Sequence, residues 1–197
     1  MSERVRPGRA NAEASSRQAF VEATARLLQR QGYTGTGLNE IVARSGAPRG
    51  SLYFHFPGGK RELAAAAMEH SGGRLREAIA AILAGSDSVG AGLAGLVDAL
   101  AAGLLASDYR DGCPIATVAL ETASDAPELR AAAASVFDSW LEAIAAHLRA
   151  GGLDAASAER RSLLVLAAIE GALLLARARG NLTPLQAVRE ELLALTP

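Results

Sequence analysis

Groups that can bind phosphate are concentrated in one short stretch of the sequence, SGAPRGSLYFHFPGGK, which runs from Ser45 to Lys60. Arg49 can pair with base edges or phosphates. The hydroxyls of Ser51 and Tyr53 and the imidazole of His55 can donate hydrogen bonds to phosphate oxygens. Glycine and proline stand near both ends of the stretch and break the chain there. The residue types and their spacing therefore predict a compact surface that binds a polyanion.

The overall charge of −1 conceals two oppositely charged parts. Residues 1–61 carry ten Arg and Lys against four Asp and Glu, a net +6, whereas residues 62–197 carry ten against seventeen, a net −7. A small basic head joined to an acidic body is typical of a protein whose head binds a polyanion. We expect residues 1–61 to form the binding domain, with 1–14 as a mobile basic tail, and residues 62–197 to form a separate domain.

The composition predicts a folded, helical protein. Half of the 197 residues are apolar and only 4% are aromatic, so the chain can bury a core as one or two domains. The first residues contain no apolar signal-peptide core, and the apolar run from Leu163 to Ala176 is too short to span a bilayer and contains Glu170. We expect a cytoplasmic protein that does not enter a membrane.

Apolar residues recur at helical spacing along most of the chain, and no strand pattern of useful length is found. Glycine and proline mark most of the breaks between the helical segments. The predicted helices run from Ser15 or Ser16 to Gly32, from Thr36 to Gly46, from Pro48 to Phe56, and over Lys60–Leu83, Val89–Ala106, Pro114–Ala123, Pro127–Arg149, Ala155–Arg179 and Pro184–Leu195. The predicted fold class is all-α, with a three-helix head followed by a helical body.

The second and third predicted helices, joined through a glycine, match a helix-turn-helix, whose second helix enters the major groove of DNA. Arg49 stands at the N-terminal end of that second helix, where side chains reach base edges. Gly50 has no Cβ to hold the backbone away from DNA. Lys60 begins the next helix, where unpaired backbone N–H groups and the helix dipole already favour an anion. These features make double-stranded DNA the predicted polyanion.

The segment TGLNEIVARSGAPRGSLYFHFPGGKREL, from Thr36 to Leu63, resembles the DNA-binding domain of TetR-family transcriptional regulators, in which a Leu-Tyr-x-x-Phe helix is followed by a short break and a lysine. The resemblance extends from about Arg17 to Met68. The strings FPGGK, DGCPIATVALE and EGALLLARAR are similar to the YxaF/LmrA-like branch of that family. Two positions depart from the pattern: Pro48 replaces a serine that often caps the recognition helix, and Val42 replaces a small alanine.

The resemblance implies a DNA-binding regulator that acts as a homodimer on a palindromic operator and needs no cofactor. It further implies a repressor that leaves DNA when a small hydrophobic effector binds residues 62–197. The positions that contact DNA in the family are occupied here by Thr36, Arg49, Gly50, Ser51, Tyr53, His55 and Lys60.

The body carries the predicted effector site. Apolar residues on three predicted helices have the spacing of either a core or the lining of an apolar cavity. Together with Cys113 and Glu121, the candidate ligand-binding residues are Leu96, Leu100, Leu104, Ile115, Val118, Phe137, Trp140, Leu141 and Ile144.

Two carboxylates, Glu121 and Glu170, interrupt otherwise apolar helix faces, so each must find a partner or shift its pKa. They either anchor a ligand or form internal salt bridges, and we favour bridges to Arg130, Arg177 or Arg179.

The helix predicted over 155–179 is apolar on more faces than one internal contact can use, which predicts dimerisation through it and through the helix over 127–149.

Two other functions are compatible with the sequence. An all-helical enzyme would need a cluster of polar residues in an apolar cavity, for which only Cys113, Glu121 and Glu170 are available. A redox sensor would use Cys113, whose place before Pro114 predicts a thiol near a helix N-terminus with a lowered pKa. No metal site is predicted, because the three histidines lack the spacing of metal ligands.

Overall fold

The computed structural model describes residues 9–122 and 125–195, with side chains from residue 14 onward. Over these ranges the chain forms α-helices and one 3₁₀ turn and no strand, which confirms the all-α prediction. The elements are α1 (Arg9–Gln31), α2 (Leu38–Ser45), the 3₁₀ turn η1 (Arg49–Ser51), α3 (Leu52–His55), α4 (Lys60–Ala84), α5 (Val89–Ala106), α6 (Pro114–Thr122), α7 (Pro127–Ala150), α8 (Ala155–Arg179) and α9 (Thr183–Leu193).

The helix bounds agree closely with the sequence pattern except at the N-terminus. α1 begins at Arg9, so the predicted start at Ser15 or Ser16 is wrong, and residues 1–8 of the predicted tail lie outside the described ranges. The segment over 9–14 is rich in alanine with an arginine and a glutamate, which are strong helix formers. Pro48 precedes the third helix rather than beginning it, because its ψ of 129° is extended and the helical backbone starts with η1.

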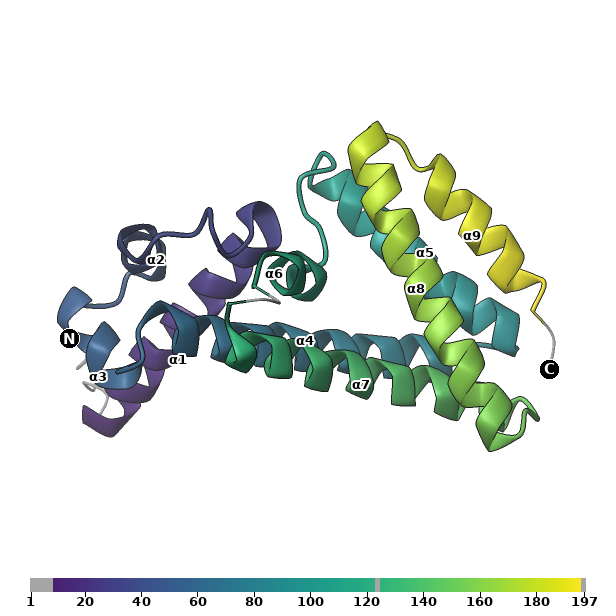
Figure 1. The fold of residues 1–197 in the computed structure, drawn as a ribbon, viewed down its shortest axis with the longest axis horizontal. Coiled ribbons are helices and arrows are strands. Elements are labelled where there is room, and N and C mark those ends of the chain that lie inside the picture. The colour runs from purple at the N-terminus through teal and green to yellow at the C-terminus, as the bar shows by residue number, and fades with distance from the viewer. Residues whose placement is uncertain (1–8, 123–124, 196–197) are drawn as a thin grey trace, which may run out of the picture.

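The head is a small domain with its own core. α1, α2 and α3 pack with the first turn of α4 at one end of the molecule, on the left in Figure 1. Gly46, with φ 66°, ends α2 in the left-handed conformation and turns the chain toward α3. The core of the head consists of Phe20, Val21, Leu27, Ile41, Leu52, Phe56 and Leu63.

The body is built around the long pair α4 and α7, which lie side by side in Figure 1, with α5, α8 and α9 at the end far from the head. Trp140 of α7 is fully buried and donates its indole N–H to the carbonyl of Gly72 in α4 at 3.0 Å. The two helices approach closely here, because a methyl group added at Gly72 would overlap the side chain of Val136. α4 therefore connects the head directly to the core of the body.

By length and composition alone, α5 could span a membrane, although the sequence was expected to contain no such helix. In the folded chain α5 packs against α4, α8 and α9. Its Leu93, Leu96 and Val97 are buried in the core of the body. This environment is that of a core helix.

Candidate functional site

The segment formed by η1 and α3 has one buried face and one exposed face. Leu52 on the inner face is buried, whereas the side chains of Tyr53 and Phe54 are 62% and 71% exposed. Arg49 and Gly50 are exposed beside them. Exposed aromatic rings next to an arginine on a short helix of a basic head suit contact with a nucleic acid. Phe54 was not among the predicted site residues, because its exposure is visible only in the fold.

Two other predicted contact residues have a polar group that is bonded or buried within the head. The hydroxyl of Ser51 donates a hydrogen bond to the carbonyl of Pro48 at 2.7 Å. Nε2 of His55 is buried and has no hydrogen-bond partner among the described residues. The imidazole packs against the rings of Phe54 and Phe56, with centroid separations of 5.1 and 6.4 Å. In this conformation the exposed face consists of Arg49, Gly50 and the two aromatic rings, without these donors.

Thr36 does not lie on the surface. Its side chain is fully buried, its hydroxyl donates to the carbonyl of Gly32 at 2.6 Å, and its N–H donates to the carbonyl of Tyr33. The Thr36 side chain is therefore not exposed for a DNA contact in this conformation, and a contact at this position stays a prediction. Thr36 therefore fixes the turn that follows α1 by donating to the carbonyls of the two residues directly after that helix.

Lys60 lies at the junction between head and body. Its ammonium group is 4.1 Å from the centre of the Tyr33 ring, a cation–π geometry. Burial lowers the pKa of Lys60 from its ordinary value, and the nearby Glu121 carboxylate opposes that shift. The lysine thus packs against an aromatic ring of the head, in the field of a carboxylate of α6.

Glu121, at the end of α6, binds the head rather than a ligand. Its Oε2 accepts a hydrogen bond from the backbone N–H of Thr34 at 2.6 Å. Its carboxylate occupies the space beside Gly32, where φ is 72° and any added side chain would collide with it. The predictions of a cavity position or an internal salt bridge for Glu121 are wrong, because the last turn of α6 faces the loop that follows α1.

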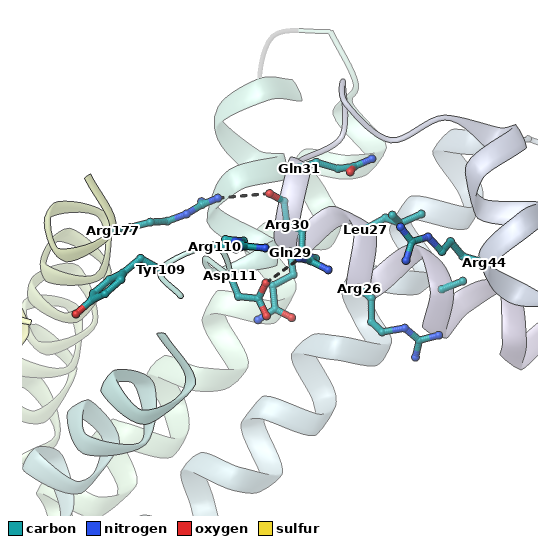
Figure 2. Close-up of a pocket in the computed structure, with 11 residues that line it drawn as sticks. Arg26, Leu27, Gln29, Arg30, Gln31, Arg44, Tyr109, Arg110, Asp111 and Arg177 are labelled. Atoms are coloured by element: carbon teal, nitrogen blue, oxygen red, sulfur yellow. Dashed lines mark hydrogen bonds and ion pairs between the residues drawn. The ribbon is translucent and has the colours of Figure 1, made fainter. Parts of the chain in front are cut away.

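A second set of contacts joins the body to the last turn of α1, across a cleft of about 720 Å³ (Figure 2). The N–H of Gly112 donates to the carbonyl of Gln29 at 3.2 Å. The guanidinium of Arg177 in α8 donates to the carbonyl of Arg30 at 3.4 Å, and Arg30 lies 3.8 Å from Asp111. These carbonyls belong to the helix end that has no intrahelical donors, so the body completes the hydrogen bonding of α1.

The arginines that line this cleft are largely neutralised by carboxylates. The pairs are Arg26 with Glu22 at 4.0 Å, Arg30 with Asp111 at 3.8 Å, Arg44 with Glu40 at 3.8 Å and Arg110 with Asp108 at 3.1 Å. The fifth arginine of the lining, Arg177, donates to the carbonyl of Arg30 instead.

An apolar cavity of about 190 Å³ lies inside the body, between α4, α5, α7 and α8. Five predicted ligand-binding residues line it: Leu96, Leu100, Cys113, Trp140 and Ile144. A neighbouring groove of about 340 Å³ opens between α6 and α8 and is lined by the predicted Phe137. Leu104, Ile115 and Val118 are buried core residues instead, and Leu141 lines neither space.

The sequence pattern missed the contributions of α4 and α8 to the cavity. The lining residues from these helices, of which only Glu170 was considered as a ligand anchor, are Leu75, Ala78, Ile79, Ile82, Leu166, Ile169, Glu170 and Leu173. Positions 75, 79 and 82 follow the i, i+4, i+7 spacing of one helix face, which was a usable signal.

Cys113 and Glu170 both lie in the wall of the cavity. The sulfur of Cys113 accepts a hydrogen bond from the N–H of Ala116 at 3.4 Å. Burial raises the pKa of the Cys113 thiol far above its usual range, and Glu170 raises it further. Burial also raises the pKa of Glu170, which the thiol partly opposes.

This pair corrects two predictions. The pKa of Cys113 is not lowered by the start of α6, because the cost of burying a thiolate outweighs the backbone donors there. Glu170 takes part in none of the ion pairs found within residues 14–122 and 125–195. Arg177, one of its expected partners, reaches the carbonyl of Arg30 instead.

Comparisons with known proteins agree with both halves of the fold. Residues 20–67 match the family of bacterial regulatory proteins described as the tetR family, and residues 90–191 match the LmrA/YxaF-like C-terminal domain of transcriptional regulators. The HTH-type transcriptional regulator LmrA of Bacillus subtilis is 36% identical over 86% of this chain and 90% of its own length. YxaF of the same organism is 33% identical over 90% of this chain and 93% of its own.

Solved structures show the same fold. A TetR transcriptional regulator from Chloroflexus aurantiacus superposes with a TM-score of 0.76 and 30% identity over 93% of this chain and 94% of its own. One from Legionella pneumophila gives a TM-score of 0.79 at 20% identity over 96% of this chain and 97% of its own. With its helix-turn-helix head and helical body both matched in sequence, the chain belongs to the TetR family of DNA-binding transcriptional regulators, with an LmrA/YxaF-like C-terminal domain.

Proposed function

We propose that the protein is a cytoplasmic, homodimeric repressor that a small hydrophobic molecule releases from a palindromic operator. The observation that carries this proposal is the course of α4. At its first residue, Lys60, α4 belongs to the basic head, and at Leu75, Ile79 and Ile82 it forms a wall of the apolar cavity. A ligand that displaces this wall moves the element on which the head is mounted.

The DNA-binding face is proposed to be the exposed side of η1 and α3. Arg49 is placed to reach base edges, Gly50 to allow close approach of the backbone, and Tyr53 to contact phosphates. Ser51 and His55 join this surface only if their donors turn outward on binding. Lys60 reaches a phosphate only by leaving the ring of Tyr33.

The proposed dimer interface is the exposed face of α8. Leu163, Leu164, Leu174 and Leu175 are all more than half exposed. The two leucine pairs lie about three helical turns apart and therefore share one face. A twofold axis through this face presents two recognition helices to an inverted repeat with half-sites about 34–36 Å apart, or a multiple of that distance.

Release from the operator requires a ligand that prefers the displaced form of α4, because a ligand with equal affinity for both forms shifts nothing. Couplings of this kind are about 1–3 kcal/mol, a change of roughly 5- to 150-fold in operator affinity. The contacts of Glu121 with Thr34 and of Gly112 with Gln29 join the body to the loop after α1 and to its last turn. They provide a second route by which a shift in the body reaches the head.

The proposal is tested by incubating the purified protein with random genomic fragments and sequencing those it retains. Enrichment of one inverted repeat supports it, whereas a direct repeat or no enrichment contradicts the proposed docking. Repeating the selection with and without reductant addresses the redox alternative. The buried, protonated thiol of Cys113 predicts the same retained fragments under both conditions.

A further inference from the structure

The α1–α4 groove, a space of about 370 Å³, lies between α1 of the head and the part of α4 that enters the body. Its polar and charged lining residues are Glu22, Arg26, Gln29, His70, Ser71 and Arg74. Four residues of the groove, Gln29, Leu75, Ala78 and Pro114, also line the apolar cavity. The groove and the cavity are therefore neighbours, and Gln29 is the polar side chain among the four residues between them.

The charges of the α1–α4 groove are unevenly paired. On α1, the Glu22 carboxylate accepts a hydrogen bond from the side-chain amide of Gln18 at 3.0 Å and lies 4.0 Å from Arg26. On α4, Arg74 takes part in none of the ion pairs found among the described residues. Nε2 of His70 is buried and has no hydrogen-bond partner among them. The α4 side of the groove can therefore bind one anionic group through a guanidinium and an imidazole.

The sizes of the two spaces favour a molecule that uses both. An engineered cavity of about 150 Å³ holds benzene, so the cavity of about 190 Å³ holds little more than one aromatic ring. Sites for drug-sized ligands are about 300–1,000 Å³, a size that the groove of about 370 Å³ reaches. From Arg74 in the groove to Ile82 in the cavity, α4 advances about 12 Å at 1.5 Å per residue. An elongated molecule can span this distance.

The cavity suits the apolar part of such a molecule and not an anionic end. Among the described residues that line the cavity, none carries a positive charge, and the acidic one is Glu170. An anion that is buried without a cation is costly. An acid group on the ligand therefore stays in the groove, beside Arg74 and His70.

We propose that the effector is an elongated apolar carboxylic acid, whose carboxylate binds Arg74 and His70 in the α1–α4 groove and whose apolar body passes Gln29 into the cavity. A guanidinium and a carboxylate form two parallel hydrogen bonds, and the single charge of the ligand balances the single charge of Arg74. This inference rests on the proposed effector response and names the chemical class of the effector.

Such a ligand contacts the head directly. Gln29 belongs to α1, its side chain lies between the groove and the cavity, and its carbonyl accepts the hydrogen bond from the N–H of Gly112. A ligand that displaces Gln29 therefore acts on a contact between the head and the body. The same ligand lies against α4, so it bears on both helices that connect the two domains.

Two probes of one shape test the acid group: biphenyl-4-acetic acid, which is ionised at neutral pH, and its neutral amide. Calorimetry with the DNA-free protein gives both affinities, and we expect the acid to bind about tenfold more tightly than the amide. Trp140 is the only tryptophan of the chain and lines the cavity, so its fluorescence reports entry of the biphenyl group. Acetate, which lacks the apolar body, should leave that fluorescence unchanged.

Variants of the groove separate a local contact from the overall charge. Arg74→Gln should abolish the advantage of the acid, whereas Arg76→Gln removes the same charge from an exposed position that lines neither space and should preserve it. His70→Phe keeps a ring but removes the donor, and it should weaken the acid and not the amide. Glu22→Gln removes a competing carboxylate and should tighten the acid alone. Thermal unfolding checks that each variant folds.

Three results each overturn the proposal. They are an amide that binds unchanged protein as tightly as the acid, an equal loss of acid affinity in Arg74→Gln and Arg76→Gln, and an acid that binds without changing the fluorescence of Trp140. An operator-binding assay distinguishes failure of the proposed function. An acid that binds as expected but leaves the protein on DNA refutes the effector response alone. If the amide releases DNA as well as the acid does, the role of the acid group is refuted and the effector response stands.

Discussion

Arg49→Ala separates base recognition from general attraction to DNA. Arg49 is exposed at the start of η1 and forms no ion pair with any described residue. Its truncation should therefore leave the stability of the head unchanged. A bidentate contact with a base edge is worth about 1–3 kcal/mol. With two half-sites per dimer, the operator affinity should fall by about 2–6 kcal/mol, from roughly thirtyfold to more than ten-thousandfold.

Lys60→Ala should act differently, because an ammonium group that reaches a phosphate reads no sequence. It should weaken operator and scrambled duplex to a similar degree and reduce the slope of log K against log salt by about 0.9 for each phosphate that the lysine neutralises. Arg76→Ala is the matched control. It removes an exposed cation from α4, about 24 Å along the helix from Lys60 at 1.5 Å per residue.

The measurement is a titration of each variant against operator and scrambled duplex at several salt concentrations, with thermal unfolding to confirm the fold. Equal weakening of both duplexes by Arg49→Ala would refute base recognition and leave only backbone positioning. An unchanged salt slope for Lys60→Ala would show that the lysine stays on the ring of Tyr33 when DNA binds.

Further variants address the dimer, the core and the buried carboxyl. Leu174→Glu places a charge on the exposed face of α8 and should give a monomer by light scattering at micromolar concentration. If the variant is still a dimer, the interface does not lie on this face of α8. Gly72→Ala forces a methyl group into Val136 and should lower the free energy of unfolding by about 1–3 kcal/mol. The control Gly73→Ala adds a methyl group that meets no atom within 4 Å and should raise the free energy of unfolding by about 0.5–1 kcal/mol. Equal effects of the two variants in urea titrations would contradict the close packing of α4 and α7. Glu170→Gln should raise Tm at neutral pH and lose that gain near pH 4. Burial raises the pKa of Glu170, so the stability that its protonated carboxyl contributes to the fold is complete below the ordinary pKa of 4.5 and is lost as the pH rises through the raised pKa. An amide does not ionise and avoids this loss. A Tm difference between Glu170→Gln and the unchanged protein that is independent of pH would refute the direction of the pKa shift.

The helices of the body were predictable because their ends are set locally. α5 begins after Ser88, whose side chain accepts from the N–H of Ala91, and α8 begins after Asp154, which accepts from the N–H of Ser157. Such caps and the glycine breaks act within one turn, so the sequence alone locates them. The helix-turn-helix was predictable for the same reason, since Gly46 ends α2 in the left-handed conformation and so marks the turn locally.

The division between core and cavity was not predictable. Leu96 and Leu104 of α5 both belong to the buried core, but only Leu96 also lines the cavity, although both follow one helical period. Periodicity shows which face of a helix is buried. It does not show where the opposing side chains leave space.

The tertiary fold also decided which polar groups face solvent. Thr36, Lys60 and Glu121 are of types that suit a binding site. In the fold, however, their side chains contact residues 32–34, directly after α1, near the junction of head and body. Their partners are the end of α1 and the loop after it, which the sequence places far from Glu121. A polar side chain takes the partner that folding brings within hydrogen-bond distance, and that distance is a property of helix packing, not of residue type.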